Sequence, residues 1–223
     1  MRKISLVIFD CDGVLVDSEY LSASVLIDVF STIGIEIDLP FVYANFVGHS
    51  FATVAASYAR LHGCNVSETF EQDYRNKLLE SFVGRLQPMT GVIQVLNQLA
   101  VPYCLASGSS PTRVTASLLI AGLQERFANR IFTTSMVRNG KPSPDIFLLA
   151  AKSFGVLPQN CLVIEDSTTG IAAAKAAGMQ VWHFTGGIHF NHGYEKVAQP
   201  HLVDRQFDRM GDFYTEAPQL RRQ

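Results

Sequence analysis

Short apolar runs alternate with longer amphipathic segments along most of this chain. Runs of four to six mostly apolar residues, each typical of a buried strand, lie at residues 4–9, 103–106, 130–133, 161–164 and 181–184. Apolar positions recur at helical spacing within residues 90–99, 111–121, 145–154 and 169–177. Because strand and helix alternate, the pattern predicts an α/β fold built on a doubly wound parallel sheet.

The stretch between the first two apolar runs has a different pattern and contains no strong strand. Its apolar spacing predicts helical segments at residues 19–32, 40–62 and 67–82. The second of these is interrupted near Gly48, and Pro88 and Gly91 mark the return to the alternating pattern. This stretch is therefore expected to form an all-helical insertion.

The insertion divides the chain into two predicted domains. Residues 1–15 and 88–223 are expected to form the α/β core, and residues 16–87 a helical cap domain. Because the insertion begins just after Asp12, it would lie over the carboxyl end of the first strand like a lid. Ligands collect at that end of an open α/β sheet.

Composition and charge narrow the function further. With 48% hydrophobic and 17% charged residues, the chain is typical of a soluble globular protein. A net charge of −2 gives no electrostatic argument for binding nucleic acid or an anionic membrane surface. No apolar run approaches membrane-spanning length, and no secretory leader pattern is visible. The four cysteines lack metal-ligand spacing, which favours reduced thiols and a cytoplasmic location.

Two aspartates, Asp10 and Asp12, follow the first apolar run and precede a glycine. In an extended chain, residues two apart point to the same side, so both carboxylates can reach one reacting centre. Two like charges so close together need a cation or a shared proton. A D-x-D sequence is also common in turns and helix caps, so its interpretation depends on the other strand ends.

Polar residues also follow the later strands. Ser107 and Gly108 come between a strand and a helix, where a hydroxyl and free backbone N–H groups can bind an anion. Lys141 lies in a stiff turn between a glycine and a proline, suited to neutralising a phosphate or the carboxylates. Glu165 and Asp166 end another strand and add the carboxylates that a hard cation such as Mg²⁺ needs.

Together these groups fit phosphoryl transfer, which needs a nucleophile, charge neutralisation and a proton donor for the leaving alcohol. Asp10 can attack phosphorus and form an aspartyl phosphate. Asp12 can protonate the leaving oxygen and then deprotonate the hydrolytic water. Lys141, the Ser107 cradle and Mg²⁺ would bind the equatorial oxygens.

At these positions the chain resembles the haloacid dehalogenase superfamily, in its helical-cap, β-phosphoglucomutase-like phosphatase branch. The first motif of that family is matched by residues 10–19, DCDGVLVDSE. The second, third and fourth motifs are matched by Ser107, by Lys141 with Pro142, and by residues 165–170. The motifs occur in the family's order and extend over most of the chain.

The resemblance implies a Rossmann-like core, a four-helix cap and a role for each motif residue. Asp10 would be the nucleophile and Asp12 the acid/base. Mg²⁺ would be held by Asp10, the Asp12 carbonyl and Asp166, while Glu165 would orient metal-bound water. The backbone after Ser107 would help to bind phosphate.

Departures from the branch concern the substrate. Mutases of this branch carry a histidine shortly after the first motif and an arginine in the cap, where this chain has Ser22 and Phe51. The difference favours a hydrolase over a mutase. Asn45, Gly48 and His49 are candidate substrate-binding residues of the cap.

We therefore predict a Mg²⁺-dependent phosphatase that acts on a small phosphorylated metabolite, with a sugar phosphate as the expected class. A phosphomutase is the main alternative. A 2-haloacid dehalogenase would not need Asp12 and the Glu165–Asp166 pair. A receiver-like signalling module would need neither Asp12 as proton donor nor the cap. His189, His192 and His201 are expected in a surface loop rather than a zinc site, and no oligomeric state is predicted.

Overall fold

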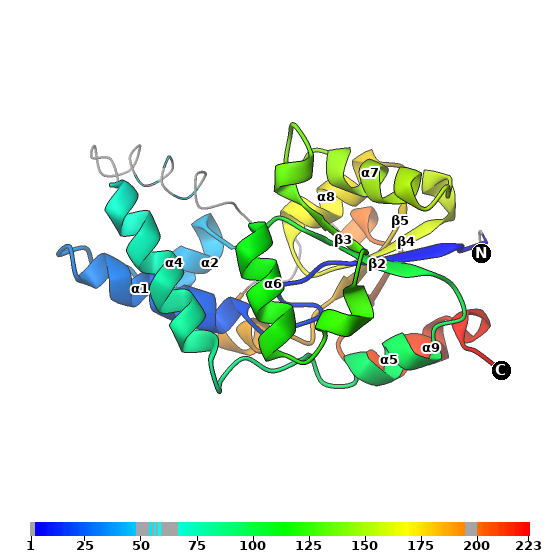
Figure 1. The fold of residues 1–223 in the computed structure, drawn as a ribbon, viewed down its shortest axis with the longest axis horizontal. Coiled ribbons are helices and arrows are strands. Elements are labelled where there is room, and N and C mark those ends of the chain that lie inside the picture. Colours follow the sequence, from blue (N-terminus) through cyan, green and yellow to red (C-terminus); the bar gives the residue numbers. More distant parts are fainter. Residues whose placement is uncertain (1–2, 48–53, 55, 57, 59–66, 195–199) are drawn as a thin grey trace.

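A parallel sheet forms the centre of the protein (Figure 1). The computed structural model describes residues 3–47, 54, 56, 58, 67–194 and 200–223. Within these residues, six strands form one sheet in the order β3-β2-β1-β4-β5-β6, and every neighbouring pair is parallel. The strands are β1 (Leu6–Phe9), β2 (Tyr103–Ser107), β3 (Ile131–Thr133), β4 (Cys161–Glu165), β5 (Gln180–Phe184) and β6 (Arg205–Phe207).

The strand order reverses direction at β1, because β2 and β3 lie on one side of it and β4 to β6 on the other. This is the doubly wound arrangement, and it confirms the predicted α/β fold class. The five predicted strands are all present, whereas β6 was not predicted. Such a reversal leaves a crevice at the carboxyl ends of the two central strands, here β1 and β4.

Helices cover both faces of the sheet (Figure 1). Those that follow β1 before β2 are α1 (Glu19–Ser31), α2 (Leu39–Asn45), α4 (Glu68–Phe82) and α5 (Val92–Gln98). The later ones are α6 (Pro111–Ile120), α7 (Asp145–Ser153), α8 (Thr168–Ala176) and α9 (Phe213–Glu216). Short 3₁₀ turns are η1 (Gln124–Phe127), η2 (Thr134–Met136), η3 (Pro158–Asn160), η4 (Ile188–His192), η5 (Pro200–Leu202), η6 (Met210–Asp212) and η7 (Pro218–Leu220).

The central strands are buried on both faces, which explains their nearly continuous apolar sequences. Along β1, Leu6 and Ile8 belong to one hydrophobic cluster, which is shared with α7 and α8. Val7 and Phe9 point the other way, into a second cluster shared with α5, α6 and α9. Side chains alternate between the faces of a strand, so β1 holds both clusters in register.

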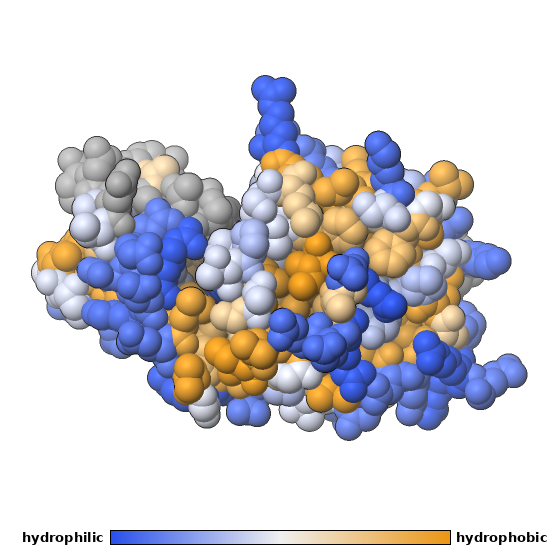
Figure 2. All heavy atoms as spheres, viewed as in Figure 1, coloured by the Kyte–Doolittle hydropathy of each residue, from blue (hydrophilic) through white to orange (hydrophobic). Residues whose placement is uncertain are grey.

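The second cluster continues into the helical region that precedes β2. Within it, Phe30 of α1 packs against Phe46, Tyr58 and Phe70, with ring centroids 6.3, 4.9 and 4.8 Å away. On α4, the buried residues Phe70, Tyr74, Leu78 and Phe82 recur every fourth position and form the apolar stripe of an amphipathic helix. Figure 2 shows hydrophilic side chains over the outer side of α4.

These helices lie to one side of the sheet in Figure 1. Much of the predicted helical segment 40–62 falls outside the described residues, so the number of helices in the proposed cap stays a prediction. Among the helices of the residues that the structure describes, none combines the length and apolar character needed to cross a membrane.

Candidate active site

The first predicted motif forms a tight turn directly after β1. Leu15 and Val16 both donate backbone hydrogen bonds to the Cys11 carbonyl, at 2.9 and 3.0 Å. Gly13 has a φ of 75°, a value that favours glycine. A Cβ at this position would lie 1.9 Å from Asp166 Oδ2, so the glycine lets the turn approach the carboxylate after β4.

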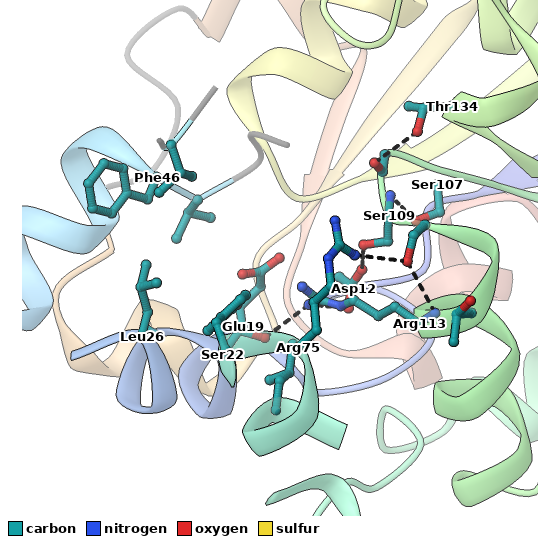
Figure 3. A pocket seen from close by; sticks show the side chains of 18 of the residues that line it. Asp12, Glu19, Ser22, Leu26, Phe46, Arg75, Ser107, Ser109, Arg113 and Thr134 are labelled. Carbon is teal, nitrogen blue, oxygen red and sulfur yellow. Dashed lines mark hydrogen bonds and ion pairs between the residues drawn. The ribbon is translucent and has the colours of Figure 1, made fainter. Parts of the chain in front are cut away.

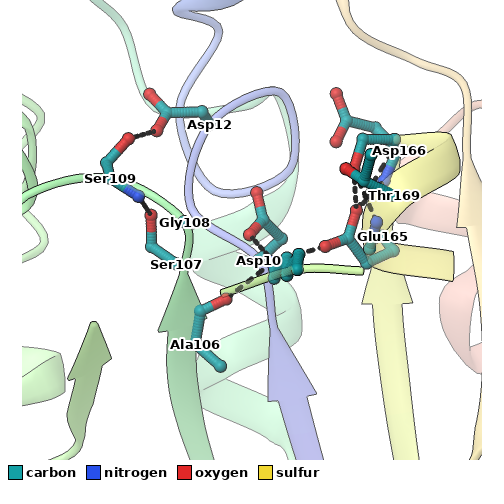
Figure 4. Close-up of polar contacts among 12 residues, drawn as sticks. Asp10, Asp12, Ala106, Ser107, Gly108, Ser109, Glu165, Asp166 and Thr169 are labelled. Atoms are coloured by element: carbon teal, nitrogen blue, oxygen red, sulfur yellow. Dashed lines mark hydrogen bonds and ion pairs between the residues drawn. The ribbon is translucent and has the colours of Figure 1, made fainter. Parts of the chain in front are cut away.

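The turn brings Asp10 to the crevice where Glu165 and Asp166 end β4 (Figure 4). One carboxylate oxygen from each of these three residues lies within 4.8 Å of the others. Lys141 reaches the same point from the loop before α7, and its Nζ donates to the carboxylates of Asp10 and Glu165. It also donates to the Ala106 carbonyl at 3.1 Å. Three carboxylates thus lie around one buried ammonium, which pairs directly with two of them.

The charge of this acidic cluster is incompletely neutralised. Burial, with the nearby carboxylates, raises the pKa of Asp10 well above its usual range, although Lys141 opposes the shift. Burial and the neighbouring Glu165 raise the pKa of Asp166 in the same way. Burial alone would lower the pKa of Lys141, but Asp10 and Glu165 outweigh it and raise that pKa. Further positive charge would relieve the cluster.

A divalent cation fits this position. Asp166 Oδ2 is buried and accepts no hydrogen bond among the described residues, so the negative charge of this carboxylate is not balanced by a donor. The donor set consists of carboxylate oxygens, the ligands that hard divalent cations prefer. The buried acidic cluster therefore has the position and chemistry of a divalent metal site.

Glu165 is held more rigidly than its neighbours. Its Oε2 accepts hydrogen bonds from the backbone N–H groups of Asp166 and Ser167, at 3.1 and 3.0 Å, and from the Ser167 hydroxyl at 3.0 Å. A Cβ on Gly170 would lie 1.8 Å from Glu165 Oε1, so α8 begins directly against this carboxylate. Ser167 also caps α8 by accepting from the Gly170 N–H.

Asp12 has different surroundings, although it belongs to the same turn as Asp10. Ser18 and Ser109 donate their hydroxyl protons to its carboxylate at 2.6 and 2.7 Å. Arg113 of α6 donates from Nη2 at 2.7 Å (Figure 3). Burial raises the pKa of Asp12, but the Arg113 charge and these hydrogen bonds outweigh it and lower that pKa below its usual value.

The predicted phosphate-binding residues lie beside these carboxylates. Ser107 is buried at the end of β2, and its Oγ accepts from the Ser109 N–H at 3.0 Å. Gly108 faces open space, because a Cβ there would meet nothing within 4 Å. Thr134 donates to the Gly108 carbonyl at 3.3 Å and fixes the loop from the side of β3.

These groups line a cavity of about 700 Å³. Its polar wall includes Asp10, Asp12, Ser107, Gly108, Lys141 and Asp166. Its other wall comes from helices α1, α2 and α4 and from the residue after α2, with Glu19, Ser22, Leu26, Phe46 and Arg75 among the residues (Figure 3). The predicted residues from four separate loops therefore share one cavity.

Of the three proposed substrate-binding residues of the cap, the structure describes only Asn45. Asn45 does not line the cavity, and its Nδ2 donates to the Phe41 carbonyl of its own helix at 2.8 Å. Gly48 and His49 lie outside the described residues. Ser22, which stands where mutases of this branch carry histidine, lines the cavity and accepts from Arg113 Nη2 at 2.9 Å.

Sequence reasoning gave no role to Arg113, Glu19 or Arg75, although all three line the cavity. Arg113 follows the helix cap Ser110 by three residues, which looks like an ordinary position in a helix. Glu19 belongs to the first motif, and burial beside Asp12 raises its pKa to about 7. Arg75 donates to Glu71 and, from Nη1, to Ser110 at 3.3 Å.

The expectation of a surface loop is wrong for His189 but correct for His192 and His201. His189 is fully buried, and its Nε2 lies 3.2 Å from Asp166 Oδ2. Burial lowers its pKa, so the ring is neutral near pH 7. His192 and His201 are exposed. The sequence around His189 is rich in glycine and polar residues, which gave no signal of burial.

Comparisons with known proteins all match the same family. The profile of the haloacid dehalogenase-like hydrolases matches residues 4–178. A 6-phosphogluconate phosphatase of Escherichia coli is 28% identical over 190 residues, covering 85% of this chain and 86% of that protein.

Two solved structures are similar over nearly their whole length. A conserved haloacid dehalogenase-like protein of unknown function from Agrobacterium tumefaciens has a TM-score of 0.81 and 30% identity, over 97% of this chain and 98% of that one. A haloacid dehalogenase family hydrolase from Deinococcus radiodurans, solved with phosphate and sodium, has a TM-score of 0.77 and 30% identity, over 99% and 97%. The chain belongs to the haloacid dehalogenase-like hydrolase family, as its motifs predicted.

Proposed function

We propose that this protein is a Mg²⁺-dependent phosphatase that hydrolyses the phosphate monoester of a small metabolite. The observation that carries the proposal is the pair of aspartates in one turn with opposite environments. Asp10 lies in the acidic cluster with Lys141, whereas Asp12 is paired with Arg113. The named phosphatase relative and the phosphate-bound structure of another relative support this chemistry.

In the first half of the reaction, a carboxylate oxygen of Asp10 attacks phosphorus and forms an aspartyl phosphate. The bond between phosphorus and the substrate oxygen breaks, and Asp12 gives that oxygen a proton. Lys141 Nζ, which already contacts Asp10, neutralises charge on the transferring group. The Ser107 hydroxyl and the backbone of Gly108 bind the remaining phosphate oxygens.

In the second half, Asp12 takes a proton from water, and the water oxygen attacks the phosphorus of the aspartyl phosphate. The bond to Asp10 breaks, and inorganic phosphate leaves. The Arg113 ion pair and the serine hydrogen bonds favour the carboxylate form of Asp12, which is the form that accepts this proton. Proton donation in the first half therefore requires Asp12 to separate from Arg113.

Mg²⁺ would be held by Asp10, Asp166 and the Asp12 carbonyl, with Glu165 orienting bound water. Its charge would supply the neutralisation that the acidic cluster lacks and would stabilise the phosphoryl group during transfer. Mg²⁺ keeps several waters and suits sites with few protein carboxylates, which is the character of this cluster.

We further propose that residues 16–87 form a cap that selects the substrate. The described part of this region contributes hydrogen-bonding side chains to the cavity from α1 and α4: Glu19, Ser22, Glu71, Gln72, Arg75 and Asn76. Apolar side chains such as Leu26 and Leu78 line the same wall, and this mixture suits a hydroxylated carbon chain, which presents hydroxyl and C–H groups together. A sugar phosphate or phosphorylated sugar acid is therefore the proposed substrate class, and the named relative acts on one of these, 6-phosphogluconate.

Reduced cysteines support a cytoplasmic site of action. Cys11, Cys104 and Cys161 are buried free thiols, which is the usual state in a reducing compartment.

The proposal is tested by measuring inorganic phosphate released from p-nitrophenyl phosphate and from a panel of phosphorylated sugars, sugar acids, nucleotides and glycolytic acids. Release should stop when a chelator removes divalent ions and return when excess Mg²⁺ is added. The acid-quenched enzyme should carry phosphate on Asp10, identified by mass spectrometry of its peptides. Turnover that persists with chelator, or an isomerised substrate with no free phosphate, would contradict the proposal.

A further inference from the structure

The Asp166 carboxylate has a buried neighbour that the proposed reaction does not use. His189 has no exposed surface, and its Nε2 lies 3.2 Å from Asp166 Oδ2. Both ring nitrogens of His189 and this oxygen lack a satisfied hydrogen bond among the described residues. Buried polar atoms without partners cost free energy, so a cluster of three such atoms calls for an explanation.

The backbone around the two side chains is shaped to admit them. A Cβ on Gly13 would lie 1.9 Å from Asp166 Oδ2 and 3.3 Å from His189 Cε1. A Cβ on Gly187 would lie 2.4 Å from His189 Cε1 and 2.5 Å from its Nδ1. Glycines from the loops after β1 and β5 therefore leave the space in which the imidazole contacts the carboxylate.

The segment that carries the imidazole is held on several sides. The Ile188 N–H donates to Asp17 Oδ1 at 3.1 Å, and the Tyr194 N–H donates to the His189 carbonyl at 3.1 Å. The rings of Phe190 and Tyr194 lie 4.3 and 5.1 Å from the imidazole, centroid to centroid. The packing therefore confines the ring to the side of Asp166.

We propose that His189 is a positioning residue whose Nε2–H, 3.2 Å from Asp166 Oδ2, closes to a hydrogen bond with that oxygen when the divalent cation binds and so orients the carboxylate. This inference rests on the proposed function, because it assigns the cation to the cluster of Asp10, Glu165 and Asp166. Hydrogen bonds from outside the ligand set orient ligating groups, and their loss typically costs about 10- to 100-fold in metal affinity. His189 lies outside the four motifs, so the roles assigned to the motif residues do not include this one.

The test measures Mn²⁺ binding by electron paramagnetic resonance of the free ion, with no substrate present. His189→Leu fills the space without a donor and should weaken Mn²⁺ binding by about 10- to 100-fold. His189→Gln can place an amide N–H near the position of Nε2 and should restore most of the affinity. His189→Asn has the same amide on a shorter side chain and should bind as weakly as His189→Leu. The matched control is His192→Leu, at an exposed position of the same turn, which should bind like the unaltered protein.

Each outcome separates the two proposals. If the unaltered protein binds no Mn²⁺, the metal site of the proposed function fails and the role of His189 fails with it. If the unaltered protein binds Mn²⁺ and His189→Leu binds it equally well, only the positioning role is overturned. Should His189→Leu not fold, as judged by circular dichroism, the Gln and Asn variants decide. Equal affinities for those two would overturn the inference, because only the longer amide reaches Asp166.

Discussion

The cavity contains two groups of carboxylates whose environments differ sharply. In the acidic cluster, Asp10, Glu165 and Asp166 share the charge of Lys141. On the other side, Asp12 accepts from Arg113 and from two serine hydroxyls. The pKa values of Asp10 and Asp166 are raised, whereas that of Asp12 is lowered.

Each aspartate has one positive partner, so the neighbouring carboxylates around Asp10 and the hydroxyl donors to Asp12, more than burial, distinguish them. Asp10 and Asp12 are equally buried, each 7% exposed. The side of Asp10 has more carboxylates than cations and therefore favours a bound cation beside the nucleophile. The side of Asp12 has a local counter-ion, so this aspartate keeps a carboxylate that can accept a proton without a metal. Two identical side chains in one turn thus acquire different chemical roles.

Among substitutions that test this difference, Asp10→Asn should have the largest effect on turnover. Asparagine keeps the shape of the side chain but cannot form the aspartyl phosphate, so kcat should fall by about 10³-fold or more. The variant also removes one negative charge from the acidic cluster, so its unfolding temperature should not fall. Phosphate release and thermal unfolding by circular dichroism measure the two effects.

The matched control is Asp28→Asn, the same substitution at an exposed position of α1. It should leave both turnover and stability unchanged. Turnover by Asp10→Asn within about tenfold of the unaltered enzyme would contradict the nucleophilic role, since a removed nucleophile costs far more.

Much of the acidic cluster could be predicted because each part has a local signal. Asp10 and Glu165 both follow apolar strands, and the ends of parallel strands meet at one edge of the sheet. Lys141 was recognisable from its turn between glycine and proline. No geometry beyond strand order was needed to bring these residues together.

The environment of Asp12 could not be predicted in the same way. Arg113 lies 101 residues from Asp12, and nothing in the helical pattern of α6 marks it as a partner. His189 was missed because its burial depends on the space left by Gly13 and Gly187, which only the folded loops create. Strand β6 was missed because two of its three residues are polar, as an edge strand allows, so it lacks the apolar run that marked the other strands.

Asp12→Asn should have the next largest effect. The amide cannot transfer the proton in either half of the reaction, so kcat should fall by about 10²- to 10⁴-fold. Phosphate binding should be affected less, because Lys141, Ser107 and Gly108 remain. Steady-state kinetics with product inhibition by phosphate separates these two effects, and an unchanged kcat would contradict the acid/base role.

Arg113→Gln sharpens the same prediction without removing Asp12. Loss of the guanidinium raises the pKa of Asp12, so a higher pH is needed to form its carboxylate. When hydrolysis of the aspartyl phosphate limits turnover, the acidic limb of the profile of kcat against pH should therefore move to higher pH. A limb that stays in place would show that Arg113 does not control the protonation of Asp12.

Glu19→Gln should have the smallest effect, and the effect should appear in stability. Burial and the neighbouring Asp12 raise the pKa of Glu19 from 4.5 to about 7 in the folded protein. Below pH 4.5 the side chain is protonated in both states, so its contribution to the free energy of unfolding is fully present. As pH rises towards 7, the unfolded state loses the proton first, and that stability is lost. Glutamine carries no such proton. Relative to the unaltered protein, the variant should therefore gain about 1–2 kcal/mol in the free energy of unfolding between pH 5 and pH 8.

Urea unfolding at the two pH values measures the gain, and Glu80→Gln, at an exposed position of α4, should show none. An equal difference between Glu19→Gln and the unaltered protein at both pH values would show that the pKa of Glu19 is the same in the folded and unfolded states. Arg113 would then neutralise the charge of Asp12 well enough that Asp12 does not raise the pKa of Glu19.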